Sequence, residues 1–319
     1  MQKYYKFHNS FIYIVFWCIS AFLTHVPVLL ANEKIVIIIR SNQVEAYNEA
    51  IEGFKEGCEE KNISIKEVYD LNGDIEEGKK AIRNIEIGKQ SPNLILAVGI
   101  LAATLAKERF TDIPVIFCMV IYHERFNLRG PNITGISTEV PLEKQFMILK
   151  KIPGKNKNIG VLYDPANTEK IISKAFHVAK RSGLNLITRE IGSEKGAASV
   201  LEELINKIDI LWIMSDSTVI TKDTLDIILM IASRHRLPTF CNSSVFAKAG
   251  VLVSISPDYK YIGYQAAIMA QTLLNNPTVV SLGIGQPDKL NLFLNTQTAN
   301  TIGIDISSFK SWPNPVLCP

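Results

Sequence analysis

Clusters of small polar residues follow four of the apolar runs in this sequence, at positions 41–43, 164–167, 215–218 and 241–244. Serine, aspartate and asparagine side chains at such positions can exchange hydrogen bonds with a bound solute. The same residue types cap helices, so one cluster alone does not identify a site. Four clusters together predict at least one ligand contact. Asp216 is the strongest single candidate, because a carboxylate can pair with a ligand ammonium group.

Residue patterns for catalysis and metal binding are absent from the sequence. It has no G-x-S-x-G motif and no phosphate-binding P-loop, and its five histidines lack the spacing of metal ligands. Residues 283–285 are a fragment of a dinucleotide-binding fingerprint without its third glycine. We therefore expect a protein that is not an enzyme, with no catalytic residue, no cofactor and no metal. An exported hydrolase is the disfavoured hypothesis, because no nucleophile–base pair is present.

The composition indicates a folded protein of two ordinary domains. Of its 319 residues, 47% are hydrophobic and 20% are charged, so a large core can be buried. The formal net charge is only +3, and no stretch of the chain concentrates it into a basic face. We therefore expect no nucleic-acid partner.

The first 31 residues have the pattern of a secretory signal peptide. Lys3 and Lys6 precede an apolar run at 11–21, and Ala31 ends the segment. This pattern predicts export to the periplasm. Leu29 stands where a cleavage site usually has a small residue, so an uncleaved membrane anchor is the alternative. No later apolar run is long enough to cross a bilayer.

Four cysteines follow this segment: Cys58, Cys118, Cys241 and Cys318. None of them forms a C-x-x-C pair or a zinc-binding pattern. A disulfide is allowed in an oxidising compartment, but the sequence does not select a pairing. Buried, unpaired thiols are the favoured interpretation.

Two fully apolar runs, 34–40 and 158–163, each open a series of alternating strand and helix patterns. A strand without polar alternation is buried on both faces, as in a parallel sheet covered by helices. The first series predicts strands at 34–40, 63–69, 94–98, 114–118 and 133–137. The second series predicts strands at 158–163, 185–190, 209–214, 238–241 and 290–294. The sequence thus predicts an α/β fold of two lobes, each built on a parallel sheet.

No low-complexity linker divides the two series. We therefore expect the chain to pass between the lobes on short segments at 133–138, 254–257 and 280–290, which together would form a multi-strand hinge. The predicted N-terminal lobe is 32–137 plus 256–282. The predicted C-terminal lobe is 138–255 plus 283–319.

Ligands of such folds bind beyond the carboxyl ends of the parallel strands. Ser41 follows the first strand there, and Gly99 precedes a helix start at Ile100 and Leu101 whose free amides can hold an anion. Tyr122, with Ile100 and Leu101, would form an apolar wall. The predicted ligand contacts of the second lobe are Asp164, Asn167, Asp216, Ser217, Asn242 and Ser243.

The chain resembles the ABC-transporter substrate-binding protein family that includes tryptophan-type amino acid binders. The matching stretches are residues 94–106, 113–117, 130–137, 141–145, 159–165, 256–259 and 262–267. The resemblance implies the type I periplasmic binding fold, with two Rossmann-like lobes that close on a small ligand. It also places Ser137 in the cleft, beside the residues named above.

Three departures from the family pattern fall in the expected site. Residues 44–45 read Val-Glu where the family has His-Pro, and residues 120–123 lack the family's Asp-Pro. Asn242 replaces an acidic residue. An aromatic amino acid ligand therefore does not follow from the resemblance.

These observations leave two leading hypotheses. The first is an exported, monomeric binding protein that captures a small polar ligand, an amino acid or a similar solute, for an ABC permease. The alternative is a periplasmic ligand sensor that docks to a membrane sensor kinase or cyclase without transport. The sequence does not name the ligand.

Overall fold

The structure is a computed structural model that describes residues 34–88, 91–154, 157–309 and 311–318. The expected signal peptide at 1–31 lies outside these residues. Residues 35–319 form one unit, and they contain two β-sheets. Among the described residues, no helix combines the length and the hydrophobicity that a membrane span requires.

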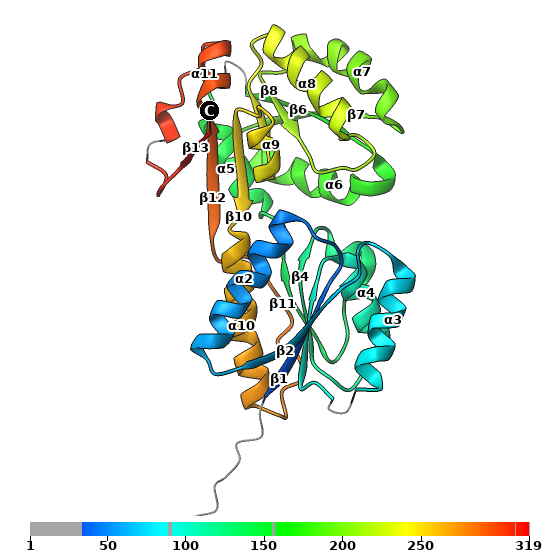
Figure 1. Cartoon of the computed structure of the whole chain (residues 1–319). Coiled ribbons are helices and arrows are strands. Elements are labelled where there is room, and N and C mark those ends of the chain that lie inside the picture. Colours follow the sequence, from blue (N-terminus) through cyan, green and yellow to red (C-terminus); the bar gives the residue numbers. More distant parts are fainter. Residues whose placement is uncertain (1–33, 89–90, 155–156, 310, 319) are drawn as a thin grey trace, which may run out of the picture. The chain divides into compact units, whose positions relative to one another are not determined.

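The first sheet has six strands in the order β11-β5-β4-β3-β1-β2 (Figure 1). Its strands are β1 (Ile35–Arg40), β2 (Ser64–Asp70), β3 (Leu94–Val98), β4 (Val115–Val120), β5 (Ile133–Ser137) and β11 (Ile284–Gly285). Every neighbouring pair is parallel. All five residues of β3 are buried, since helices cover both faces of the sheet. This confirms the double-sided burial that the apolar runs predict.

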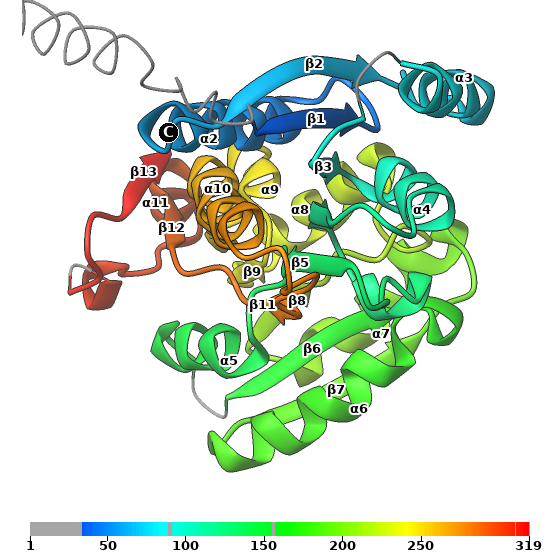
Figure 2. The same cartoon turned by 90° about the horizontal axis from the view of Figure 1, so that it is seen from below.

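Two helix layers cover the first sheet. Helices α2 (Glu45–Glu60) and α10 (Tyr259–Asn275) pack on one face, and α3 (Ile75–Glu86) and α4 (Ile100–Arg109) pack on the other. Helix α10 comes late in the sequence, yet it lies directly beside α2 in both views (Figures 1 and 2). The approach is close, because a Cβ atom added at Gly53 would lie 1.8 Å from the carbonyl oxygen of Lys260.

The second sheet has seven strands in the order β13-β12-β10-β9-β8-β6-β7. Its strands are β6 (Asn158–Tyr163), β7 (Asn185–Glu190), β8 (Ile210–Ile213), β9 (Thr239–Cys241), β10 (Val253–Pro257), β12 (Leu290–Asn295) and β13 (Val316–Cys318). Only the β10–β12 pair is antiparallel. The sheets are thus mostly parallel, and the predicted fold class of two α/β lobes is confirmed.

Helices also cover the second sheet. They are α5 (Leu142–Lys151), α6 (Pro165–Arg181), α7 (Ala197–Leu204), α8 (Lys222–Arg234), α9 (Ser244–Lys248) and α11 (Thr296–Ile302). Side chains alternate along β8, so Trp212 packs with residues of α5 and α6 while Leu211 and Ile213 pack with α7 and α8. Trp212 therefore lies on the α5–α6 side of the sheet.

The chain passes between the sheets close to the three expected segments. It leaves the first sheet after β5 and returns to it after β10, whose residues up to Pro257 pair with β12 in the second sheet. The two residues of β11 pair with β5, because the Gly135 amide donates to the Gly283 carbonyl and aligns the segments. The sequence placed residues 284–285 in the second lobe, whereas this pairing joins them to the first sheet.

Candidate functional site

A cavity of about 540 Å³ lies where segments that follow strands of both sheets meet. We call it the charged cavity. Its lining residues are Tyr122, His123, Glu124, Arg125, Ser137, Glu139, Pro165, Ala166, Asn167, Glu169, Lys170, Ile171, Lys174 and Gln286. The first five follow or end β4 and β5, and most of the others belong to α6. The site therefore lies at strand carboxyl ends, where parallel α/β sheets bind ligands.

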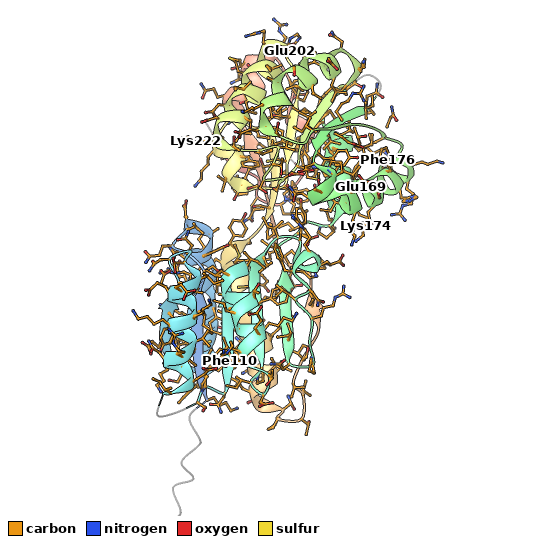
Figure 3. All side chains as sticks on the ribbon, turned by 90° about the vertical axis from the view of Figure 1, so that its right-hand side faces the viewer. Phe110, Glu169, Lys174, Phe176, Glu202 and Lys222 are labelled. Atoms are coloured by element: carbon orange, nitrogen blue, oxygen red, sulfur yellow. The ribbon has the colours of Figure 1, made fainter. Side chains whose placement is uncertain are left out.

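A second cavity of about 430 Å³ adjoins the first one. We call it the inner cavity. Five lining residues are common to both, namely Tyr122, Glu139, Ile171, Lys174 and Gln286. The inner cavity extends between α5, α6 and the ends of β8 and β9, where Trp212, Met214 and Asn242 line it. Figure 3 shows Glu169 and Lys174 on the ribbon of α6, the helix that contributes to both cavities.

The charged cavity carries both signs of charge. Arg125, Lys170 and Lys174 are positive, and Glu124, Glu139 and Glu169 are negative. Lys174 Nζ lies 3.8 Å from Glu124 Oε2. His123 Nδ1 lies 3.5 Å from Glu139 Oε1, too far for a strong hydrogen bond. A small solute with one ammonium and one carboxylate group would find opposite charges here.

Asn167 has a fixed orientation at the start of α6. Its Nδ2 donates to Thr218 Oγ1 at 2.7 Å and to Asp216 Oδ1 at 3.2 Å. The Oδ1 atom therefore faces away from these acceptors, and it accepts a hydrogen bond of 2.7 Å from Arg125 Nη2. Arg125 belongs to the segment after β4, so this bond joins residues that follow strands of different sheets.

Asp216 lies behind Asn167 and is only 2% exposed. Besides the bond from Asn167, its carboxylate accepts hydrogen bonds from the Asp164 amide at 3.0 Å and the Thr168 hydroxyl at 2.7 Å. The Thr218 amide also donates to it, at 3.1 Å. Both carboxylate oxygens are thus engaged within the protein. Asp216 lines neither cavity, and its expected contact with a ligand stays a prediction.

Tyr122 is the apolar wall residue that the sequence placed in the site, and it lines both cavities. Its backbone has the left-handed conformation (φ 56°, ψ 46°), which turns the chain out of β4 into the 3₁₀ turn His123–Phe126. Burial raises the pKa of Tyr122, and the negative charges of Glu139 and Asp216 raise it further. Its hydroxyl therefore stays protonated and can donate a hydrogen bond.

The structure brings three of the predicted contacts to the cavities. Ser137 and Asn167 line the charged cavity, and Asn242 lines the inner one. The Asn242 side chain accepts a hydrogen bond of 3.0 Å from Ser215 Oγ. Asp164 instead caps α6, through a bond of 2.9 Å from the Ala166 amide to its carboxylate.

The other predicted contacts lie outside both cavities. Ser41 Oγ accepts a bond of 2.9 Å from the Ala102 amide and so uses one of the free amides of α4. Gly99 has a φ of 86°, and a Cβ atom there would lie 2.7 Å from Ser41 Oγ. Ile100 and Leu101 pack partly against the core, Ser217 is exposed, and Ser243 directly precedes α9. Their roles as ligand contacts stay predictions.

Several lining residues had no clear signal in the sequence. Arg125 lies in an irregular segment, and Trp212 lies inside an apolar strand where it resembles an ordinary core residue. Glu139 comes two residues after the strand that ends at Ser137, which is the one signal that could have found it. Gln286 directly follows β11 and lies far in the sequence from the other lining residues.

The described cysteines are all buried and free, and no described group of three acidic, histidine or cysteine side chains could hold a metal ion.

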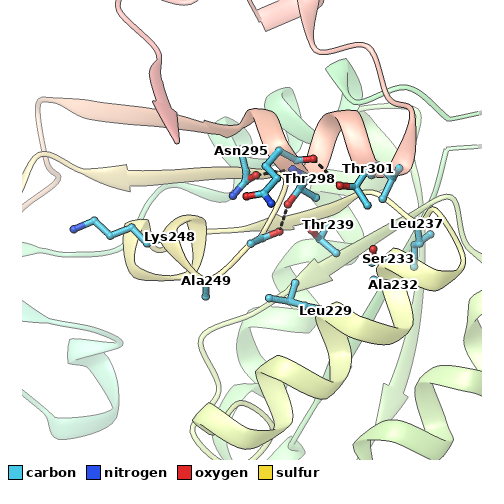
Figure 4. Close-up of a pocket in the computed structure, with 13 residues that line it drawn as sticks. Leu229, Ala232, Ser233, Leu237, Thr239, Lys248, Ala249, Asn295, Thr298 and Thr301 are labelled. Carbon is cyan, nitrogen blue, oxygen red and sulfur yellow. Dashed lines mark hydrogen bonds between the residues drawn. The ribbon is translucent and has the colours of Figure 1, made fainter. Parts of the chain in front are cut away.

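A third cavity of about 320 Å³ lies between α8, α9 and α11 (Figure 4). Thr298 there donates to the Gly250 carbonyl, and Asn295 caps α11 by accepting from the Thr298 amide. Its polar groups thus hold the local fold.

Two mostly parallel sheets with a cavity at the ends of their strands form the type I periplasmic binding fold, which solved structures of similar fold share. Residues 35–309 match the family described as ABC transporter substrate binding protein. The match covers most of the chain, so the protein belongs to this family. Its members bind small-molecule substrates and work with ABC transporter components.

Individual relatives share little sequence with the chain. A tyrosine-binding protein from Clostridioides difficile (strain R20291) is 22% identical over 218 residues, which make up 66% of this chain and 63% of that relative. The chain thus matches slightly less than two thirds of that relative's length.

Two solved structures share its fold. The ligand-free, open structure of a substrate binding protein with adhesive properties from Clostridium difficile has a TM-score of 0.77 at 22% identity, covering 89% of this chain and 99% of the other. An ABC domain in complex with L-Trp from Streptococcus pneumonia has a TM-score of 0.64 at 18% identity, covering 86% and 96%.

Proposed function

We propose that this protein is an exported solute-binding protein that captures an amino acid, or a similar small zwitterion, for an ABC importer. The observation that carries the proposal is the presence of both charge signs in one cavity at the ends of the strands. Arg125 would bind the solute's carboxylate, since a guanidinium offers paired donors to it. Glu139 would bind the ammonium group.

The surrounding side chains support this assignment. Asn167 holds Arg125 at the cavity through its bond of 2.7 Å, so the guanidinium is placed before a ligand arrives. Tyr122 and Ile171 add apolar surface for the solute's body. The name of the curated relative, a tyrosine-binding protein, agrees with an amino acid ligand. Export to the periplasm rests on the pattern of residues 1–31 and stays part of the proposal.

Melting temperatures with and without added solutes test the proposal. A ligand that binds only the folded chain raises the melting temperature, so at least one amino acid of a standard panel should do so. The Arg125→Gln variant should lose most of this rise. Arg83→Gln is the control, because Arg83 lies on α3, is exposed and lines neither cavity. Equal loss in both variants, or no rise with any amino acid, would refute the assignment.

A further inference from the structure

Two residues that line the inner cavity each have a buried polar atom without a hydrogen-bond partner. Trp212 Nε1 and Gln145 Oε1 make no hydrogen bond to any part of the chain that the structure describes. Trp212 is 1% exposed and Gln145 is 3% exposed, and both side chains line this cavity. Buried polar groups in folded proteins almost always have a partner. Two residues beside the same cavity thus have an unpaired donor and an unpaired acceptor. This points to a ligand group that forms hydrogen bonds with both atoms.

Both side chains are held in place by the fold. The Phe146 ring packs edge-on against Trp212, with ring centroids 5.5 Å apart. Gln145 Nε2 donates to the Val140 carbonyl at 2.8 Å, which fixes the amide and leaves Oε1 as its open atom. The two atoms therefore offer one hydrogen-bond donor and one acceptor from rigid elements, β8 and α5.

The rest of the wall of the inner cavity has an apolar part and a polar part, and Glu139, Glu143, Lys174, His177 and Arg181 are the ionisable residues of the polar part. Val140, Leu142, Ile171, Val178 and Met214 form the apolar part. This part of the wall favours an apolar ligand body by removing its surface from water. The cavity adjoins the charged cavity through Tyr122 and Glu139, so a ligand whose charged groups lie beside Arg125 can extend into it.

We infer that the inner cavity is the specificity pocket of this protein, and that it selects an amino acid side chain with an apolar body and a tip that both donates and accepts a hydrogen bond. Trp212 and Gln145 are the residues that determine this selection. A hydroxyl group fits this requirement, because it can accept a hydrogen bond from a donor such as Trp212 Nε1 and donate one to an acceptor such as Gln145 Oε1. The inference rests on the proposed amino acid function.

The matched pair of L-tyrosine and L-phenylalanine tests the inference, since the two differ by one hydroxyl group. The protein to titrate is the folded chain from residue 32 onward. Calorimetry should show that it binds L-tyrosine at least about tenfold more tightly than L-phenylalanine, because phenylalanine leaves both buried atoms unpaired. Equal dissociation constants for the two amino acids would overturn the inference and leave the proposed function standing. Absence of binding by any amino acid would overturn both.

The Trp212→Phe variant separates selection from packing. It removes the N–H donor and keeps an aromatic ring, so the tyrosine-to-phenylalanine affinity ratio should fall towards one. Phe309→Leu is the control, because Phe309 belongs to the same core cluster and lines neither cavity. That control should change both affinities together and keep their ratio. A ratio that falls equally in the two variants would contradict the role of Trp212.

Discussion

At the scale of residues, the site depends on a few side chains that other side chains hold. The sequence predicted Asn167 and Asn242 because small polar residues follow strands, and the family resemblance added Ser137. The structure places all three at the cavities. It could not predict Arg125, whose irregular segment has no periodic pattern. Long-range hydrogen bonds, such as the one from Arg125 to Asn167, depend on tertiary placement and leave no local signal.

Asp216 is expected to act through Asn167. In the Asp216→Asn variant one oxygen becomes an NH₂ group, so at least one of the four present donors would face another donor. We expect a loss of about 1–3 kcal/mol in the free energy of unfolding. Amino acid affinity should fall as well, because Asn167 loses part of its anchor. Denaturant unfolding curves and titration calorimetry measure the two effects.

The control for this variant is Asp226→Asn, an exposed aspartate on α8. Substitutions at such surface positions usually change stability by less than about 0.5 kcal/mol. An Asp216→Asn variant that is as stable as this control, with unchanged affinity, would show that the carboxylate does not organise the site.

The buried thiols are expected to be inert in the folded protein. Burial raises the pKa of Cys118 and of Cys241 to about 12. Since the unfolded thiols ionise near a pKa of about 8.5, they lose protons at lower pH than the folded ones. The stability contributed by these two groups is therefore complete below about pH 8.5 and falls as pH rises towards 12.

Thiol labelling with a chromogenic disulfide reagent checks this prediction. Cys118 and Cys241 should stay unlabelled at neutral pH and react fully in denaturant. Rapid labelling of either residue in the native protein would contradict the burial that the structure assigns to it.

At the scale of elements, the long apolar patterns were sufficient to predict most strands. The strands at 94–98, 133–137, 158–163 and 185–190 have the predicted bounds. The short strands β11 and β13 had no prediction. A strand of two residues such as β11 has no periodicity, and its pairing with β5 is set by contacts far away in sequence.

The contact between α2 and α10 depends on glycine. A Cβ atom at Gly53 would overlap the backbone of α10, since it would lie 1.8 Å from the Lys260 carbonyl oxygen. Gly53→Ala should therefore force the helices apart and destabilise the first lobe by at least about 1–3 kcal/mol. Gly196→Ala is the control, because nothing lies within 4 Å of its added Cβ atom. Equal unfolding curves for the two variants would contradict the close packing.

At the scale of the whole molecule, the cavities combine residues from distant parts of the sequence. Tyr122 follows β4, Asn167 begins α6, and Gln286 follows β11. The sequence predicted two lobes and a site at their strand ends from the doubled strand-and-helix pattern alone. The arrangement of charges could be seen only in the structure. The charged residues of the cavity come from the segment after β4, the segment after β5 and helix α6, which are separate in the sequence.

The central claim is that opposite charges in the charged cavity hold one zwitterionic solute. Titration calorimetry with three matched compounds tests it most directly: the amino acid with the tightest binding, the amine that lacks its carboxylate, and the acid that lacks its ammonium group. We predict one amino acid bound per chain, and affinities at least about tenfold weaker for each partial compound, since each leaves a charged partner unpaired. Equal affinities for the three compounds would contradict the claim.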